Sequence, residues 1–238
     1  MSVKSVYILD PAIESGRIRI TGDEHQHLKV GRAEEGETLE VFDGKGGVWT
    51  GKVEAAGKRE TVVQVVEHRQ VEKSGPELIL GLSLVKPAAF ELALEKAVEV
   101  GVTRIVPVVA ARSNAASLKR SDRLGRLTRI LVEAAKQSKR YDVPEMDEPV
   151  GFDGALNVSA ATKIVFAEHG GGPLKSALAG SPAFFLVGPE GGWTDAELES
   201  ARQKGFALVG LGEGILRTET AAIVGAALIR YELQKRNS

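Results

Sequence analysis

The sequence predicts an α/β protein in which a small β-barrel precedes a larger domain built on a parallel sheet. Residues 1–72 contain short stretches of alternating polar and apolar residues separated by glycine, a pattern typical of a small barrel. After Pro76, strand-like and helix-like segments alternate, which predicts parallel strands covered by helices on both faces. The polar stretch 72–76 is expected to be the linker, so we place the two domains at 1–72 and 73–238.

Four segments of the first domain are expected to be strands. They alternate between polar and apolar residues, and they cover 17–20, 38–42, 48–53 and 61–66. Asp43-Gly44 and Gly46-Gly47 supply hairpin-turn residues between the second and third of these segments. Strands of this length joined by tight turns account for the barrel prediction.

In the second domain the expected strands are short apolar runs, at 78–83, 104–109, 163–167, 184–187 and 206–209. Helices are expected between them, one from Pro87 to Gly101, one capped by Ser121, and two more over 195–204 and 220–236. The first of these helices has an apolar face made of Phe90, Leu94, Ala97 and Val98.

Composition excludes several classes of protein. No apolar run approaches the roughly 20 residues that span a bilayer, and the N-terminus lacks the apolar stretch of a signal peptide. We therefore expect a cytoplasmic protein without a membrane partner. The chain has no cysteine, which excludes disulfides and thiolate metal sites. His25 and His27 alone are a poor metal signature, so we expect no metal.

Charge is unevenly distributed along the chain. The net charge of −1 argues against indiscriminate binding to nucleic acid. From Arg112 to Arg140, however, nine basic residues stand against two acids, Asp122 and Glu133. Such a run is often only a solvated helix face, but within a nearly neutral chain this excess favours a surface that faces phosphate.

The most informative segment joins a strand to a helix through a glycine-rich turn. The apolar residues 184–187 are followed by Gly188-Pro189-Glu190-Gly191-Gly192, and Thr194 and Glu197 then form a capping box. Glycines allow the backbone to approach a ligand closely beside a helix start. Such a connection can also be purely structural, and its spacing matches neither the dinucleotide-binding nor the triphosphate-binding glycine loop.

A second glycine-rich segment follows further along the chain. It runs Gly210-Leu211-Gly212-Glu213-Gly214-Ile215-Leu216-Arg217-Thr218-Glu219-Thr220-Ala221 and leads from a strand into a helix. The two segments, in this order, resemble the closing motifs of the SPOUT methyltransferases. More narrowly, the chain resembles the RsmE family, which carries a Gly-Pro-Glu-Gly-Gly turn and an Ile-Leu-Arg-Thr-Glu-Thr-Ala loop.

This resemblance implies a function and a fold that the pattern alone does not give. RsmE proteins methylate N3 of a uridine in 16S ribosomal RNA of the small ribosomal subunit. Their methyl donor is S-adenosylmethionine, and the product is S-adenosylhomocysteine. The resemblance further implies a trefoil knot in the second domain, a PUA-like first domain that docks RNA, and a homodimer packed through the knotted domains.

The resemblance also implies roles for individual residues. Arg217 is expected to be catalytic, holding RNA phosphate or uracil carbonyls so that the N3 anion forms more easily. Solvent is expected to take the proton, since no general base stands out. Ile215 and Leu216 could equally be core residues, and Glu168 a surface acid. The residues expected to contact the cofactor are Glu168, Leu186, Gly188, Pro189, Glu190, Gly191, Gly192, Leu211, Gly212, Ile215, Leu216 and Thr220.

Three further segments match the family and are expected to meet RNA. The first is 25–32 in the first domain, and the second is Arg112, after the second strand of the second domain. The third is 133–140, whose polar residues share one helix face. The expected RNA-binding residues are Lys29, Arg32, Arg112, Arg123, Arg126, Gln137 and Arg140. The chain departs from the family pattern at Gly31, usually a leucine, and at Glu213-Gly214, where relatives commonly carry an arginine.

Three alternative functions stay open at the level of sequence. The same fold could methylate transfer RNA or another ribosomal base. A non-catalytic RNA-binding factor that has lost its cofactor is a second alternative, against which the two intact glycine segments argue. A phosphate-binding metabolic enzyme is disfavoured because the phosphate-loop fingerprint is absent from the sequence.

Overall fold

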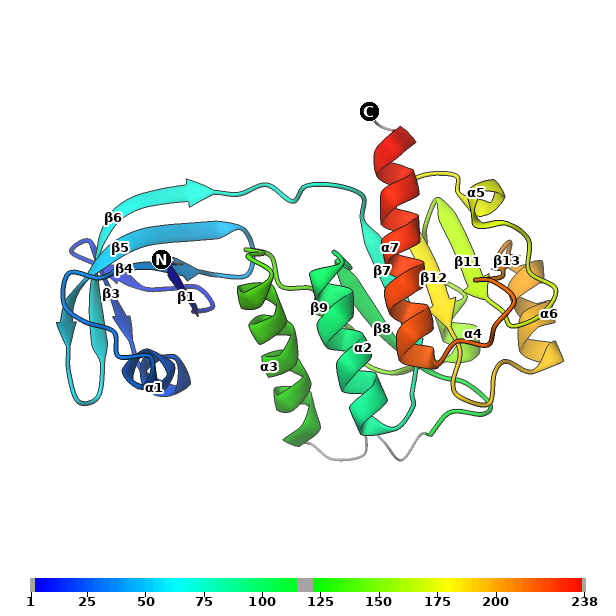
Figure 1. Ribbon diagram of the computed structural model, residues 1–238, viewed down its shortest axis with the longest axis horizontal. Coiled ribbons are helices and arrows are strands. Elements are labelled where there is room, and N and C mark those ends of the chain that lie inside the picture. The colour runs from blue at the N-terminus through cyan, green and yellow to red at the C-terminus, as the bar shows by residue number, and fades with distance from the viewer. Residues whose placement is uncertain (1–2, 115–121, 237–238) are drawn as a thin grey trace. The chain divides into compact units, whose positions relative to one another are not determined.

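Figure 1 shows the computed structural model, which describes residues 3–114 and 122–236, with the side chains of residues 122–124 left aside. The chain divides into two compact units. The first holds the chain up to Lys73 together with Ala135–Val143, and the second holds Ser74–Ala134 and the chain from Pro144 onward. The α/β class predicted from the order of strands and helices is confirmed.

The first unit is a six-stranded sheet around an apolar core. All neighbouring strands pair antiparallel except β1 and β4, which run parallel. Alternate residues such as Ile18, Ile20 and Val63 point into the core, as the period of a strand requires. In sheet order the strands are β1 (Lys4–Tyr7), β4 (Thr38–Phe42), β5 (Gly47–Ala56), β6 (Thr61–Gln70), β3 (Arg17–Ile20) and β2 (Ile13–Glu14).

One helix of the first unit, α1 (Gly22–Val30), was not predicted. Its buried residues are Leu28 and His25, so its apolar face is too narrow to show a helical period in the sequence. Nδ1 of His25 lies 3.0 Å from the hydroxyl of Thr61 on β6, which satisfies this buried polar ring. His25 therefore joins α1 to the sheet.

The last turn of α3 (Asp122–Gln137) and the chain that follows it, up to Val143, belong to the first unit. The backbone N–H of Gly46 donates to the Tyr141 carbonyl at 3.0 Å, and that of Val143 donates to the Gly44 carbonyl at 2.9 Å. The Tyr141 hydroxyl donates to Glu40 at 2.8 Å, and burial together with this carboxylate raises the pKa of Tyr141. These contacts are largely between main-chain groups, so no sequence motif marks them.

The second unit is a seven-stranded sheet whose pairings are all parallel, and this confirms the predicted parallel sheet. Strand β12 lies between β7 and β11, and β13 lies outside β11. The strands are β7 (Leu78–Ser83), β8 (Arg104–Val109), β9 (Glu145–Met146), β10 (Val150–Gly151), β11 (Thr162–Phe166), β12 (Ala183–Val187) and β13 (Ala207–Val209). Besides α3, the helices of the remaining chain are α2 (Pro87–Glu99), α4 (Phe152–Ala155), α5 (Leu174–Ala177), α6 (Asp195–Gln203) and α7 (Thr218–Arg236). None of the helices that the structure describes is long and apolar enough to cross a membrane.

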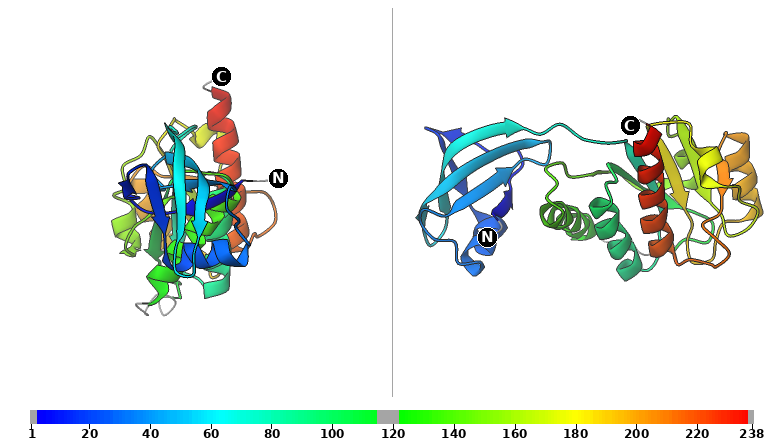
Figure 2. Two further views of the ribbon diagram at one scale, coloured as in Figure 1. Left: turned by 90° about the vertical axis from the view of Figure 1, so that its left-hand side faces the viewer. Right: turned by 45° about the horizontal axis from the view of Figure 1, so that its top comes forward.

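Helices cover both faces of the parallel sheet (Figures 1 and 2). Helices α2 and α7 lie side by side on one face, while α4 and α6 lie on the other. The second face buries Phe152 of α4 and Ala201 of α6 in one apolar cluster with Trp193. On the first face, Gly225 of α7 lies so close to the ring of Phe166 that a side chain at 225 would overlap it. Helix α7 is thereby held against the end of β11.

The predicted elements of the second unit agree with the observed ones to within about two residues, the accuracy expected of helix ends. Helix α2 begins at Pro87 and buries the predicted apolar face. Helix α7 begins at Thr218, two positions before its predicted start at 220. The predicted cap Ser121 lies outside the described residues. Elements β9, β10, α4 and α5 were not predicted, because runs of two to four residues show no period.

Candidate active site

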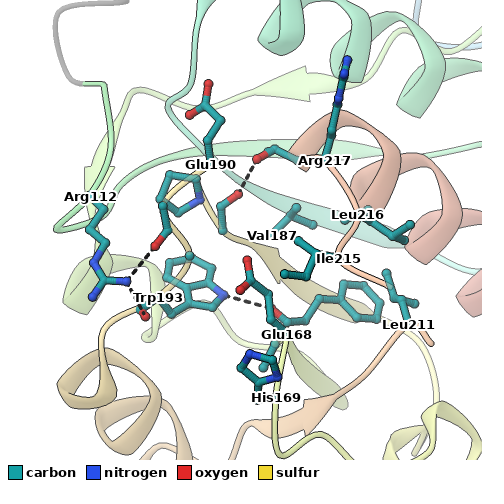
Figure 3. A pocket seen from close by; sticks show the side chains of 18 of the residues that line it. Arg112, Glu168, His169, Val187, Glu190, Trp193, Leu211, Ile215, Leu216 and Arg217 are labelled. Carbon is teal, nitrogen blue, oxygen red and sulfur yellow. Dashed lines mark hydrogen bonds between the residues drawn. The ribbon is translucent and has the colours of Figure 1, made fainter. Parts of the chain in front are cut away.

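A cavity of about 1040 Å³ opens at the carboxyl ends of β11, β12 and β13 (Figure 3). Three loops line it, namely residues 166–170 after β11, residues 187–193 after β12, and the chain between β13 and the first turn of α7. Lys86, Arg112 and several residues of α6 complete its wall. Parallel α/β sheets usually bind their ligands at this edge, so the topology itself marks the cavity as a site.

The loop after β12 turns sharply and enters α6 through the predicted capping box. The N–H of Gly192 donates to the Pro189 carbonyl at 2.9 Å, and Gly192 adopts φ 67°, a left-handed conformation that glycine accepts readily. The N–H of Glu197 donates to the Thr194 hydroxyl at 3.2 Å, and the N–H of Thr194 donates back to the Glu197 carboxylate at 2.8 Å. Both halves of the capping box are present, which confirms the prediction.

Trp193 fixes the same loop to the neighbouring strand. Its indole Nε1 donates to the carbonyl of Phe166, the last residue of β11, at 3.0 Å in a buried position. The indole ring also packs on Gly188, where an added Cβ would lie 3.2 Å from ring atoms. The Glu168 carboxylate, two residues after β11, lies 3.4 Å from where a Cβ on Gly192 would stand. The loops after β11 and β12 are therefore in direct contact.

The loop before α7 is supported by a second glycine-rich stretch. The N–H of Gly172 donates to the Leu208 carbonyl at 2.9 Å, and the N–H of Gly210 donates to the Gly172 carbonyl at 3.3 Å. Gly171 lies against the backbone of Gly210 so closely that a Cβ at 171 would overlap it. Only a residue without a side chain permits this approach. The start of this loop at Gly210 therefore packs against the main chain of Gly171 and Gly172.

One buried hydroxyl joins the two glycine loops that the sequence singled out. Thr218, 4% exposed, donates from Oγ1 to the carbonyl of Gly188 at 2.9 Å. The two residues are 30 positions apart in the sequence. This bond therefore connects the loop after β12 to the start of α7 at the cavity. Thr218 was not among the predicted site residues, although the Thr-Glu-Thr helix start could have suggested it.

Both loops carry main-chain donors that have no protein acceptor. In the described part of the chain, the N–H groups of Glu190 and Gly191 make no hydrogen bond, and the same holds for residues 211–217. Backbone amides left in this state bond to water or to a ligand. A cavity bordered by such donors can recognise a small polar molecule through the main chain.

Most of the predicted cofactor residues meet at this cavity. Ten of them line it, namely Glu168, Gly188, Pro189, Glu190, Gly191, Gly192, Leu211, Gly212, Ile215 and Leu216. Leu186 does not, because it is fully buried in the sheet core, and Thr220 is also absent from the lining. Ile215 is 71% exposed, so the alternative of core packing does not apply to it. The roles of all these residues stay predictions.

Charged side chains of both signs line the cavity. Arg217, the predicted catalytic residue, lines it together with Lys86, which was not predicted. The backbone N–H of Lys86 donates to the Glu190 carboxylate at 3.4 Å, which places Lys86 beside the glycine loop. Neither the Lys86 nor the Arg217 side chain bonds to another group within the described residues. His169 is a further lining residue that was not predicted.

The predicted RNA-binding residues are divided between the two units. Lys29 and Arg32 lie exposed at the end of α1 in the first unit. Gln137 is exposed at the end of α3, and Arg140 donates to Asp142 at 2.6 Å. Among those whose side chains are described, Arg112 alone lines the cavity. The side chain of Arg123 lies outside the described residues.

Much of the basic run from 112 to 140 is already bonded within the protein. Arg126 pairs with Glu91 at 2.8 Å, and Lys136 pairs with Glu24 at 3.1 Å. Lys139 donates to the carbonyl of Val3 at 3.0 Å. Counting charges along the sequence therefore overstates how many cations are free to meet phosphate.

Comparison with known proteins identifies the class that this fold and site define. A family model described as an RNA methyltransferase domain matches residues 72–230, and one described as an RNA methyltransferase PUA domain matches residues 20–66. The chain is thus an RNA methyltransferase with a PUA domain ahead of the parallel α/β sheet.

Its relatives narrow the class to one family. The ribosomal RNA small subunit methyltransferase E of Synechocystis sp. is 31% identical over 98% of this chain and 79% of its own. That of Rickettsia conorii is 29% identical over 97% and 96%. The crystal structure of the Neisseria gonorrhoeae protein of this name, bound to S-adenosyl methionine, matches with a TM-score of 0.87 and 29% identity over 97% of this chain and 98% of that one. The chain belongs to the ribosomal RNA small subunit methyltransferase E family, and the resemblance seen in the sequence is confirmed.

Changing Thr218→Val should destabilise the protein, because it removes the donor and leaves the Gly188 carbonyl without its partner. We expect a loss of about 1–2 kcal/mol in the free energy of unfolding. Urea denaturation measures this loss. Thr218→Ser keeps the hydroxyl and should recover most of the difference; equal stability of the valine and wild-type proteins would show that the bond is unimportant.

Proposed function

We propose that this chain methylates N3 of a uridine in 16S ribosomal RNA, using S-adenosylmethionine. The observation that carries the proposal is the bond from Thr218 to the Gly188 carbonyl, which joins two glycine loops around one cavity. The names of the relatives and the bound S-adenosyl methionine of the Neisseria gonorrhoeae protein support it.

The residues of the cavity fit this cofactor. Leu211, Ile215 and Leu216 offer an apolar wall for a purine, beside amides that can bond to its nitrogen atoms. The amides of Glu190 and Gly191 suit the polar end of the molecule, and Glu168 offers a carboxylate to hydroxyl or amino groups. When bound, S-adenosylmethionine supplies a methyl group on a sulfonium, which is already a good leaving group.

What the protein must supply is alignment and help with the N3 proton. Loss of that proton leaves a negative charge shared by N3 and the two uracil oxygens. Arg217 lies at the cavity, and its side chain has no partner among the residues that the structure describes, so its guanidinium is available to this charge. Lys86 lines the same cavity and adds a second positive charge. Positive groups held in place before reaction stabilise the charge that develops during it.

Docking of the RNA falls, in this proposal, to the first unit. The match to an RNA methyltransferase PUA domain covers α1, where Lys29 and Arg32 are exposed. Such cations contact phosphate and set the register of the RNA, while the cavity selects the base. The small ribosomal subunit or its RNA is the proposed partner.

A trefoil knot is part of the proposal. Strand β13 lies outside β11, yet the chain that follows it returns to contact Gly188 after β12 through Thr218. A return of this kind supports threading of α7 through the preceding loop. An experimental trace whose ends could be pulled straight without crossing another segment would contradict the knot.

The proposed function predicts two outcomes with the purified protein. Calorimetry should detect binding of S-adenosylmethionine, and small subunits from a strain lacking this enzyme should gain N3-methyluridine when protein and cofactor are added. Mass spectrometry of nuclease digests measures the modified base. Methylation of transfer RNA or of another ribosomal base would favour the first alternative function, and an absence of cofactor binding would favour the RNA-binding factor.

Replacing Arg217→Ala should lower kcat by about 10²-fold, the scale of losing one preorganised charge partner. Without this cation the pKa of the uracil N3–H rises, so the rising limb of the pH–rate profile should move to higher pH. Arg217→Lys keeps a positive charge and should move the limb less. An unchanged profile in the alanine variant would remove Arg217 from the chemistry.

The second unit should form a homodimer through α2 and α7. Leu92 of α2 and Leu228 and Tyr231 of α7 are 42%, 42% and 55% exposed, on two adjacent helices. Exposed apolar side chains grouped in this way are typical of an interface. Leu228→Glu should shift the mass in sedimentation equilibrium from dimer to monomer, whereas Leu9→Glu, an equally apolar and exposed site on the first unit, should not. A wild-type monomer would contradict the proposal.

A further inference from the structure

We propose that Arg112 is a positioning residue that holds the glycine loop 188–193 in the form that binds the ligand, and is not itself an RNA contact. The inference rests on the proposed function, because it gives a role to one residue of the same site. It departs from the sequence-based expectation, in which Arg112 meets RNA.

The guanidinium of Arg112 is bonded to the loop (Figure 3). Its Nη1 donates to the carbonyl of Gly191 at 2.7 Å and approaches the carbonyl of Trp193 at 3.4 Å. The stem of the side chain covers the same turn, since a Cβ on Gly191 would lie 3.2 Å from Cδ and 3.3 Å from Cβ of Arg112. One side chain therefore bonds to two carbonyls and covers Gly191, the residue that carries one of them.

Arg112 can act as a clamp because its own backbone is held. The N–H of Ala111 donates to the carboxylate of Glu197 at 2.8 Å, and Glu197 is 8% exposed. On the other side, the N–H of Asn114 donates to the Leu84 carbonyl at 2.9 Å. Glu197 is also the carboxylate of the capping box that begins α6. The segment that carries Arg112 and the helix that follows the loop thus share one buried anchor.

The clamp leaves the ligand-facing donors free. Arg112 bonds to carbonyl oxygens, while the N–H of Gly192 is used within the turn by the Pro189 carbonyl. The amides of Glu190 and Gly191, which have no partner within the described ranges 3–114 and 122–236, lie between these two fixed points. Because the carbonyls of Pro189 and Gly191 are both held, the N–H groups of Glu190 and Gly191 between them keep a fixed direction. A binding site gains affinity when its donors are already ordered.

Arginine suits this role better than lysine. Its planar guanidinium presents donors in a fixed fork, so that carbonyls at different positions can be held together. A lysine keeps the positive charge that a phosphate contact needs but lacks the fork. Comparing the two residues at position 112 therefore separates a clamp from an RNA contact.

The test measures loop order and ligand affinity separately. In the ligand-free protein, Arg112→Ala should speed hydrogen exchange at the amide of Gly192, which is hydrogen-bonded within the turn, while the capping-box amide of Glu197 stays protected. Calorimetry should show S-adenosylmethionine binding weakened about tenfold, the scale of losing a hydrogen bond to a charged group. Arg112→Lys should recover little of this affinity. Binding of small-subunit RNA to the ligand-free protein, and its salt dependence, should stay as in the wild type.

Arg236→Ala is the matched control. Arg236 also donates to two backbone carbonyls, those of Leu178 at 2.7 Å and Lys175 at 3.0 Å, and neither residue lines the cavity. This variant should leave exchange at the Gly192 amide and cofactor affinity unchanged. Equal weakening in both variants would mean that any loss of such a bond disturbs the unit, and the specific role of Arg112 would be rejected.

The remaining outcomes decide between roles. If Arg112→Ala keeps wild-type exchange and cofactor affinity but loses RNA affinity, and lysine restores the RNA affinity, Arg112 is an RNA contact and the clamp is wrong. If the wild-type protein binds no S-adenosylmethionine, the proposed function fails. The clamp would still be judged by exchange in the ligand-free protein.

Discussion

The hydroxyl of Thr218 and the carbonyl of Gly188 meet at 2.9 Å, and the site depends on this contact. The bond ties the start of α7 to the turn after β12, across 30 residues of chain that include α6 and β13. Loops at the edge of a sheet are ordinarily the most variable and mobile part of a fold. Here one buried donor joins two of them, so that their free amides and the cations Lys86 and Arg217 surround a single cavity.

Glycine and a few well-placed polar side chains produce that arrangement together. Gly171 lets two stretches of backbone touch, and Gly225 lets α7 approach β11 at Phe166. Trp193, Glu197 and Arg112 then fix the turn after β12 from three directions, through Phe166, Ala111 and Gly191. In this account the recognition surface is largely main chain, and the side chains serve to hold it. In the proposed function, the cations Arg217 and Lys86 act on the reacting base.

Features of this site that depend on residues close together in the sequence could be predicted, whereas contacts between distant residues could not. The capping box of Thr194 and Glu197 is local, so its spacing alone was enough to predict it. The strands were predicted from alternation or short apolar runs, and the long helices from their apolar faces and end residues. Helix α1 was missed because it buries so few side chains. The partners of Thr218 and Arg112 could not be predicted, because they lie 30 and 79 residues away in the sequence. The packing of the chain after α3 within the first unit could not be predicted either, because contacts between main-chain groups leave no pattern of residue types.

The central claim is that one small ligand is held by the main chain of both glycine loops at once. Amide NMR of the labelled protein, recorded while S-adenosylmethionine is added, tests it most directly. The signals of Glu190 and Gly191 and those of 211–217 should shift together at the same ligand concentration, while amides of the first unit stay unchanged. Shifts confined to one loop, or centred away from the carboxyl ends of β11 and β12, would contradict it.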